Sequence, residues 1–110
     1  MLIFDIEIYR NYFLASFMND KGQVCHIEMR GDGKLEVSKL AKLMRDNITL
    51  GFNSNSYDLY MVAAALENKS CAELKALSNE IIMSNLPAWK VAKVTIPRTW
   101  DTIDIIDVLQ

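Results

Sequence analysis

The chain has 110 residues, of which 51% are hydrophobic and 24% are charged, and its formal net charge is −2 at pH 7. This length and composition predict one soluble globular domain. The weak negative charge excludes a broad positive surface field, so any contact with nucleic acid has to be local. No apolar stretch approaches the ~18 residues of a membrane span, and no basic segment precedes the first apolar run as in a signal peptide. Cys25 and Cys71 follow no disulfide pattern, which favours free thiols and a cytoplasmic location.

Three strands are predicted in the first third of the chain. Residues 2–8, 12–19 and 23–30 are apolar runs of strand length, and residues 19–22 (Asn-Asp-Lys-Gly) supply turn residues between the last two runs. This arrangement is typical of a β-hairpin. Residues 31–33 (Gly-Asp-Gly) then interrupt the sheet.

Helices dominate the prediction for the middle of the chain. Apolar residues recur with helical period over residues 35–46, and a short apolar strand follows at residues 48–52. Residues 54–56 (Ser-Asn-Ser) are typical helix caps, so we predict a helix over residues 57–68. A further helix is predicted over residues 71–84.

The last part of the chain predicts an irregular segment and a final strand. Pro87 and Pro97 bracket residues 88–96, which we expect to be extended or irregular, and residues 102–108 form the predicted strand. The order of the elements predicts an α/β fold with a mixed sheet, a leading antiparallel hairpin and crossover helices. Because a crossover fold normally adds another helix after such a strand, we expect the single domain 1–110 to be incomplete at its C-terminus.

Two carboxylates in the first strand are the most informative feature of the sequence. Asp5 and Glu7 lie two residues apart in an apolar run, so their side chains point to the same face of a strand. Two carboxylates on one buried face would repel each other and raise one pKa, unless a cation lies between them. We therefore expect a divalent metal ion at this point. The alternative is a salt bridge from each acid to a Lys or Arg side chain.

A third carboxylate is predicted at the start of a helix. Asp58 follows a strand and a set of cap residues, and a helix N-terminus favours the ionised form of a carboxylate. Such an acid could join Asp5 and Glu7 across a pair of cations, which can activate water and stabilise a leaving oxygen. Acids in a first helical turn are also common without any function.

These segments resemble a known family. The run Phe4-Asp5-Ile6-Glu7 resembles the first exonuclease motif of the DEDD (DnaQ-like) 3′–5′ exonucleases, which include the proofreading domains of DNA polymerases. Asn53-x3-Tyr57-Asp58 is similar to the second motif, and residues 100–104 (Trp-Asp-Thr-Ile-Asp) resemble an Asp-Thr-Leu segment on a later strand. The resemblance spans nearly the whole chain. It implies a ribonuclease-H-like fold and a two-metal hydrolase, with Mg²⁺ or Mn²⁺, that acts at the 3′ end of a nucleic acid.

The resemblance also implies roles for single residues. By this resemblance Asp5, Glu7 and Asp58 are the metal ligands, and Glu7 helps to orient the attacking water. Asn53 and Tyr57 would support the site beside the nucleic acid, although both also suit the start of a helix.

Two further residues have weaker signals. Tyr9 follows the acidic strand and either stacks on a terminal base or packs in the core. Asp101 matches the family's later segment, where a hydrogen-bonded structural acid is the alternative to a supporting role in the site.

One part of the family pattern is not found in these 110 residues. The third motif is His-x4-Asp or Tyr-x3-Asp, whereas the one histidine, His26, lies early on a predicted hairpin strand. The chain therefore lacks the general base and the fourth carboxylate, and loss of a positioned general base slows a reaction by ~10²–10⁴-fold. We expect weak or no activity from this chain alone, whether it is a fragment of a nuclease, a short descendant of one, or a chain completed by a partner.

The rival interpretation is a non-catalytic module. A nuclease-like domain without its last helix would expose apolar surface to a protein partner, a second copy or nucleic acid. A small viral protein that inhibits a host factor could be built in this way.

Overall fold

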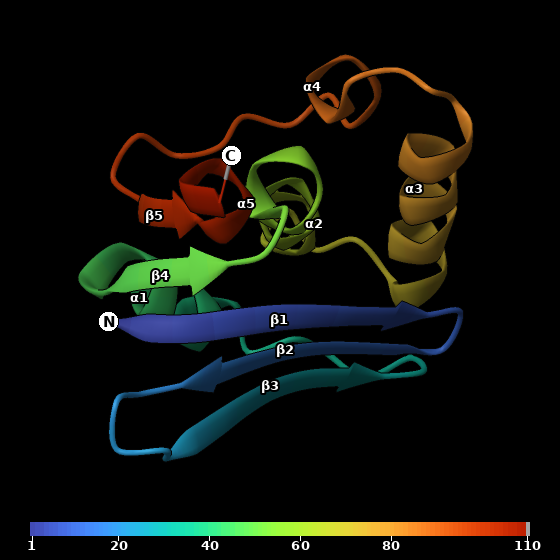
Figure 1. Ribbon diagram of the computed structural model, residues 1–110. Coiled ribbons are helices and arrows are strands. Elements are labelled where there is room, and N and C mark those ends of the chain that lie inside the picture. Colours follow the sequence, from blue (N-terminus) through green and yellow to red (C-terminus); the bar gives the residue numbers. More distant parts are fainter. Residues whose placement is uncertain (110) are drawn as a thin grey trace.

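The computed structural model describes residues 1–109, in which three consecutive strands are followed by helices and two further strands (Figure 1). The strands are β1 (Leu2–Tyr9), β2 (Tyr12–Met18), β3 (Val24–Arg30), β4 (Ile48–Gly51) and β5 (Asp101–Asp104). The helices are α1 (Val37–Asp46), α2 (Asp58–Ala65), α3 (Cys71–Met83), α4 (Ala88–Val91) and α5 (Ile105–Leu109), with a short 3-10 helix η1 (Ser54–Ser56). Among the helices of residues 1–109, none is long and apolar enough to span a bilayer.

The strands form one mixed sheet in the order β3-β2-β1-β4-β5 (Figure 1). β2 pairs antiparallel with both β1 and β3, which confirms the predicted hairpin. β4 runs parallel to β1 and to β5. The prediction of an α/β fold with a mixed sheet and flanking helices is therefore confirmed.

The side chain of Asn19 builds the turn of the β2–β3 hairpin. Its Oδ1 accepts hydrogen bonds from the backbone N–H of Lys21 at 3.0 Å and of Gln23 at 2.9 Å. Asparagine is favoured in turns because its side chain can satisfy backbone donors in this way. Gly22 completes the turn with a φ of +79°, which an L side chain rarely adopts.

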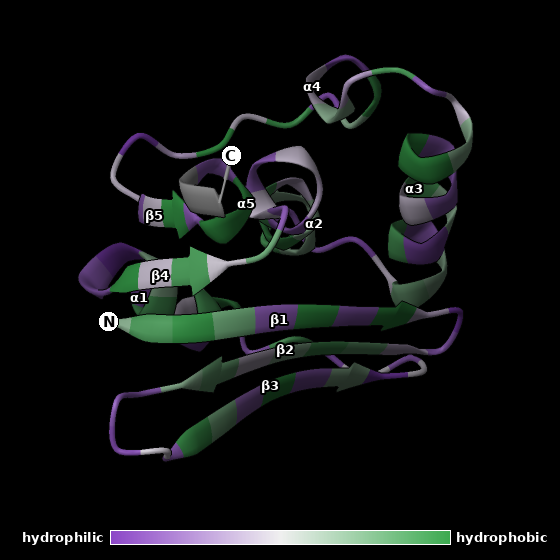
Figure 2. Cartoon of the chain, viewed as in Figure 1, coloured by the Kyte–Doolittle hydropathy of each residue, from purple (hydrophilic) through white to green (hydrophobic). Residues whose placement is uncertain are grey.

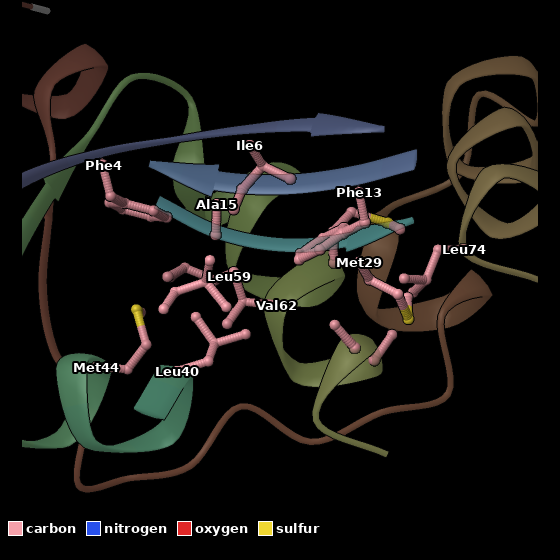
Figure 3. Packing of buried hydrophobic residues seen from close by; sticks show 14 of the residues in the cluster. Phe4, Ile6, Phe13, Ala15, Met29, Leu40, Met44, Leu59, Val62 and Leu74 are labelled. Atoms are coloured by element: carbon pink, nitrogen blue, oxygen red, sulfur yellow. The ribbon is translucent and has the colours of Figure 1, made fainter. Parts of the chain in front are cut away.

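The hydrophobic core lies on one face of the sheet, between the strands and helices α1, α2 and α3 (Figure 3). Side chains alternate along β1, so Phe4 and Ile6 are buried in this core while Asp5 and Glu7 are exposed. Figure 2 shows the same alternation of apolar and polar residues along β1. The core also contains Phe13, Ala15, Phe17 and Ile27 of the hairpin, Leu40 and Met44 of α1, Leu59 and Val62 of α2, and Leu74 of α3.

Three segments differ from the prediction. The last strand ends at Asp104, and residues 105–109 form α5, whereas a strand was predicted over residues 102–108. Residues 54–56 form η1, and α2 spans Asp58–Ala65, so this helix ends earlier than the predicted residue 68. Part of the segment after Pro87 is helical, as the single turn α4, although the rest is irregular as predicted.

Candidate functional site

β1 presents Asp5 and Glu7 on the same face of the sheet, as the sequence predicted. Both side chains are exposed, however, because the neighbouring Phe4 and Ile6 take the face that packs in the core. The expectation that this pair lies on a buried face is therefore wrong. In the described part of the chain, neither acid forms a salt bridge with Lys or Arg, because the two ion pairs found there join Arg30 to Glu28 and Arg45 to Asp46.

The side chains of Phe4 and Ser54 approach the backbone of Gly51, where the chain leaves β4 towards Asp58. A Cβ atom at Gly51 would lie 2.7 Å from Cε1 of Phe4 and 2.7 Å from Cβ of Ser54. Only glycine fits between these two side chains without a shift. The chain then turns through Asn53, which has left-handed φ and ψ angles of 56° and 27°. Asparagine tolerates this conformation better than most residues.

Asp58 is the first residue of α2 and is 8% exposed. Burial is the main cause that raises the pKa of this carboxyl from 3.8 to about 7, and the negative charges of Asp5 and Asp104 raise the pKa further. The helix N-terminus predicts an ionised Asp58, whereas burial and these two charges favour the protonated carboxyl when no cation is bound. Because the charge of Asp5 acts on Asp58, these two of the three predicted ligands lie near each other.

Asp104 is a buried acid that the sequence did not single out for the site. It is 4% exposed at the end of β5, and its carboxylate accepts hydrogen bonds from the backbone N–H groups of Asn53 at 2.8 Å and Asn55 at 2.9 Å. A third bond comes from the backbone N–H of Ile106 at 3.1 Å. Because the carboxyl ends of parallel strands meet at one edge of a sheet, β5 brings this acid beside the segment that leads to Asp58.

Asp101 lies at the other end of β5. It pairs with Ile48 at the start of β4 and is exposed, whereas Asp104 pairs with Gly51 at the carboxyl end. Of the two aspartates on this strand, Asp104 is thus the one that lies beside Asp58.

Asn53, Tyr57 and Tyr9 differ in their surroundings. Asn53 is exposed next to Asp58, whereas Tyr57 is half-buried and its hydroxyl is hydrogen-bonded to Oγ of Ser78 at 2.5 Å. Tyr57 therefore helps to hold α3 against the start of α2. Tyr9 is 53% exposed and its ring stacks on that of Tyr12, with the ring centroids 6.3 Å apart, so it is not a core residue.

The acids in this region are chemically suited to a divalent cation. Carboxylate oxygens are the ligands that Mg²⁺ and Mn²⁺ prefer, and a cation would remove the repulsion between Asp5 and Asp58. Within residues 1–109, no three His, Cys, Asp or Glu side chains are already close enough together to hold a metal ion. Glu7 shares the face of Asp5, but its negative charge acts on Tyr12 and does not contribute to the raised pKa of Asp58.

An open pocket of about 470 Å³ adjoins Asp58. Phe52, Asn53, Ser56, Tyr57, Ile81 and Ile82 form its other walls. Phe52 is 63% exposed and Ile82 is 62% exposed, so apolar surface is available beside the carboxylate. A larger pocket of about 580 Å³, between residues 31–35 and the start of α3, contains none of the predicted site residues.

Comparison with known proteins found no matching family model, no matching curated protein and no matching solved structure. A function for this chain is therefore inferred from its own side chains and their arrangement.

Proposed function

We propose that this chain is part or a descendant of a DEDD-type 3′–5′ exonuclease domain with a ribonuclease-H-like fold. The proposal is carried by the buried Asp58, on which the charge of Asp5 acts, since neither acid has a Lys or Arg partner in the described part of the chain. The sheet order, with antiparallel β2 and β3 on one side of β1 and parallel β4 and β5 on the other, is compatible with that fold.

The proposed metal site uses Asp5, Glu7 and Asp58 as ligands. When bound there, Mg²⁺ or Mn²⁺ would activate a water molecule and stabilise the oxygen that leaves a phosphodiester. Asp58 would lose its proton on binding, because a cation favours the ionised carboxylate. Glu7, on the exposed face beside Asp5, would help to orient the attacking water. Asp104 would act only through the backbone of the segment before Asp58.

The pocket beside Asp58 is the proposed position of the terminal nucleotide. Its apolar wall, formed by Phe52 and Ile82, suits the face of a base, and stacking of a base on an aromatic ring contributes about 1–3 kcal/mol. The exposed Asn53 offers a polar contact next to the carboxylate. Tyr9, at the far end of β1, is the proposed stacking residue for a further base.

Activity of this chain alone is expected to be weak or absent. The 110 residues contain neither the histidine nor the tyrosine motif that supplies the general base in this family. Assays that detect metal binding therefore test the site more directly than turnover does.

The first test is a thermal melt with increasing Mn²⁺. A cation that binds only the folded state must raise the melting temperature as its concentration rises. We expect a rise at millimolar Mn²⁺ for the wild type and for Asp20→Asn, an exposed control in the β2–β3 turn. Asp5→Asn and Asp58→Asn should lose the rise. A wild-type melting temperature that does not depend on Mn²⁺ would rule out the site.

The second test is Mn²⁺-dependent degradation of 3′-labelled single-stranded DNA, compared with Asp5→Ala. If Asp5→Ala degrades the DNA as fast as the wild type does, the catalytic assignment is wrong, because the activity then comes from other residues or from a contaminating nuclease.

A non-catalytic binding module is the second candidate. The observation in its favour is a group of exposed apolar side chains on α3, α4 and the loop between them: Ile82, Met83, Leu86 and Trp89. Such a group is typical of a contact surface for a partner. If Mn²⁺ stabilises the protein but no degradation occurs, a binding role for a protein partner or a nucleic acid 3′ end, as in a viral inhibitor of a host factor, becomes the better proposal.

A further inference from the structure

The face of the sheet opposite the core carries a row of apolar side chains that crosses all five strands. Strand register places Val24 of β3 beside Met18 of β2, Met18 beside Ile3 of β1, Ile3 beside Leu50 of β4, and Leu50 beside Ile103 of β5. We call these five residues the open-face row. At ~4.8 Å between neighbouring strands, the row is roughly 19 Å wide.

The open-face row is not part of the core. None of its residues belongs to the buried cluster or to the apolar residues that pack against it. Ile3 is 48% exposed, Met18 38% and Val24 54%, while Leu50 and Ile103 are partly exposed. Helices α1, α2 and α3 contribute their buried residues to the core on the other face.

A bare apolar face is unusual for strands of this kind. β1, β4 and β5 are parallel, and parallel strands are normally covered on both faces by helices. The ordinary cover for such a sheet is the apolar stripe of an amphipathic helix.

Unpaired acids border the open-face row on both sides. Along β1 the same face continues with Asp5 and Glu7, and along β5 it begins with Asp101, two residues before Ile103. In residues 1–109 none of these three acids forms an ion pair. Arg30, on the same face, already contacts Glu28 and lies over the ring of Tyr12. A second copy of the chain would bring the same acids to the interface, so charge disfavours a face-to-face dimer.

We propose that this face is the docking surface for an amphipathic α-helix of a partner protein, whose apolar stripe covers the open-face row and whose Lys or Arg residues lie against the bordering acids. The open-face row is distinct from the pocket beside Asp58, but Asp5 and Glu7 are also the proposed cation ligands. The proposal therefore applies to the chain without a bound cation, and it does not depend on nuclease activity.

A synthetic helix tests the surface. The probe is a fluorescent peptide of about 18 residues, long enough to be helical, with Leu along one stripe and Lys on both flanks. Its matched control carries Glu in place of every Lys. Fluorescence anisotropy at low ionic strength measures the affinity of both peptides for the intact chain.

Protein variants locate the peptide. Ile3→Thr with Val24→Thr keeps branched strand residues and removes apolar surface, and Asp101→Asn removes one bordering charge. Met83→Gln on α3 is the control, because Met83 is 78% exposed but belongs to the other apolar group. Circular dichroism confirms that each variant is folded.

The expected result is saturable binding of the Lys peptide and at least about tenfold weaker binding of the Glu peptide. The double threonine variant should lose about tenfold or more in affinity, and Met83→Gln should bind like the wild type. Equal binding of both peptides, no binding at all, or a loss caused equally by Met83→Gln would overturn the proposal. Sedimentation that shows a dimer abolished by the double variant would assign the face to a second copy instead.

Discussion

The carboxylate of Asp104, at the end of β5, accepts a hydrogen bond from the backbone N–H of Asn53 at 2.8 Å. The two residues are 51 positions apart in the sequence. With a second bond from the N–H of Asn55, this contact fixes the segment that leads from β4 to α2. The position of Asp58 therefore depends on a residue of the last strand.

Asp104→Ala is expected to lower the free energy of unfolding by about 2–4 kcal/mol. The substitution leaves three partly buried backbone donors without their acceptor, and hydrogen bonds to charged groups contribute about 1.5–3 kcal/mol each. Urea denaturation measures the change. Asp101→Ala is the matched control on the same strand, and because Asp101 is exposed its effect should stay within about 0.5 kcal/mol. Equal effects of the two substitutions would contradict the role given to Asp104.

The raised pKa of Asp58 predicts a pH dependence of stability in the absence of divalent cations. The pKa of Asp58 is about 7 in the folded protein, and the ordinary value of 3.8 applies to the unfolded chain. Between these two pH values the folded protein therefore binds more protons than the unfolded chain. The free energy of unfolding contributed by this group therefore falls as pH rises from about 4 to about 7, and stays low above that range.

Asp58→Asn isolates this contribution because asparagine does not titrate. In EDTA, the stability of the variant relative to the wild type should increase between about pH 4 and pH 8, by on the order of 2–4 kcal/mol. Urea unfolding at a series of pH values gives this difference directly. A difference that is constant across the range would show that Asp58 has an ordinary pKa.

Gly51→Ala is expected to destabilise the fold by about 1–3 kcal/mol, as overpacking of a close contact does. The new methyl group would lie 2.7 Å from Cε1 of Phe4 and from Cβ of Ser54. Phe4→Leu shortens one of these neighbours, so the double variant should be more stable than the sum of the single effects predicts. Additive effects in thermal or urea unfolding would show that Phe4 does not restrict the space at Gly51.

Tyr57→Phe tests whether the tyrosine has a structural role apart from any contact with substrate. Removal of the hydroxyl leaves Oγ of Ser78 without its partner, which should cost about 1 kcal/mol of stability. Ser78→Ala should have an effect of similar size, and the double variant should lose less than the sum of the two. Strictly additive losses in urea unfolding would indicate that the two hydroxyls do not interact in solution.

Periodicity was sufficient to predict most of the fold. Alternation of apolar residues predicted the hairpin strands and β4, and a 3.6-residue repeat predicted α1 and α3. The folded protein keeps these elements because their apolar faces are buried. The end of the chain was harder, because the run Ile103-Asp104-Ile105-Ile106 suits a strand or a helix equally. The side chain of Asp104 decides the matter by accepting a bond from the N–H of Ile106, as acids at the start of a helix do.

The candidate site was only partly visible in the sequence. A two-residue spacing predicts that Asp5 and Glu7 lie on one face of the strand. It does not predict whether that face is buried, because burial depends on where the helices pack. Asp5 and Asp58 lie near each other because β4 pairs parallel with β1. No local sequence pattern predicts the register of that pairing. Asp104 was missed because the predicted strand ran past it, so that the carboxyl end of β5 was placed too late in the chain.

The central claim is that Asp5, Glu7 and Asp58 gather around a divalent cation. Paramagnetic broadening by Mn²⁺ in a ¹H–¹⁵N spectrum of the labelled chain tests this claim most directly. The account predicts that the amide signals of residues 5, 7 and 58 broaden first and that Asp58→Asn abolishes the effect. Signals that broaden first elsewhere, or that broaden unchanged in Asp58→Asn, would contradict it.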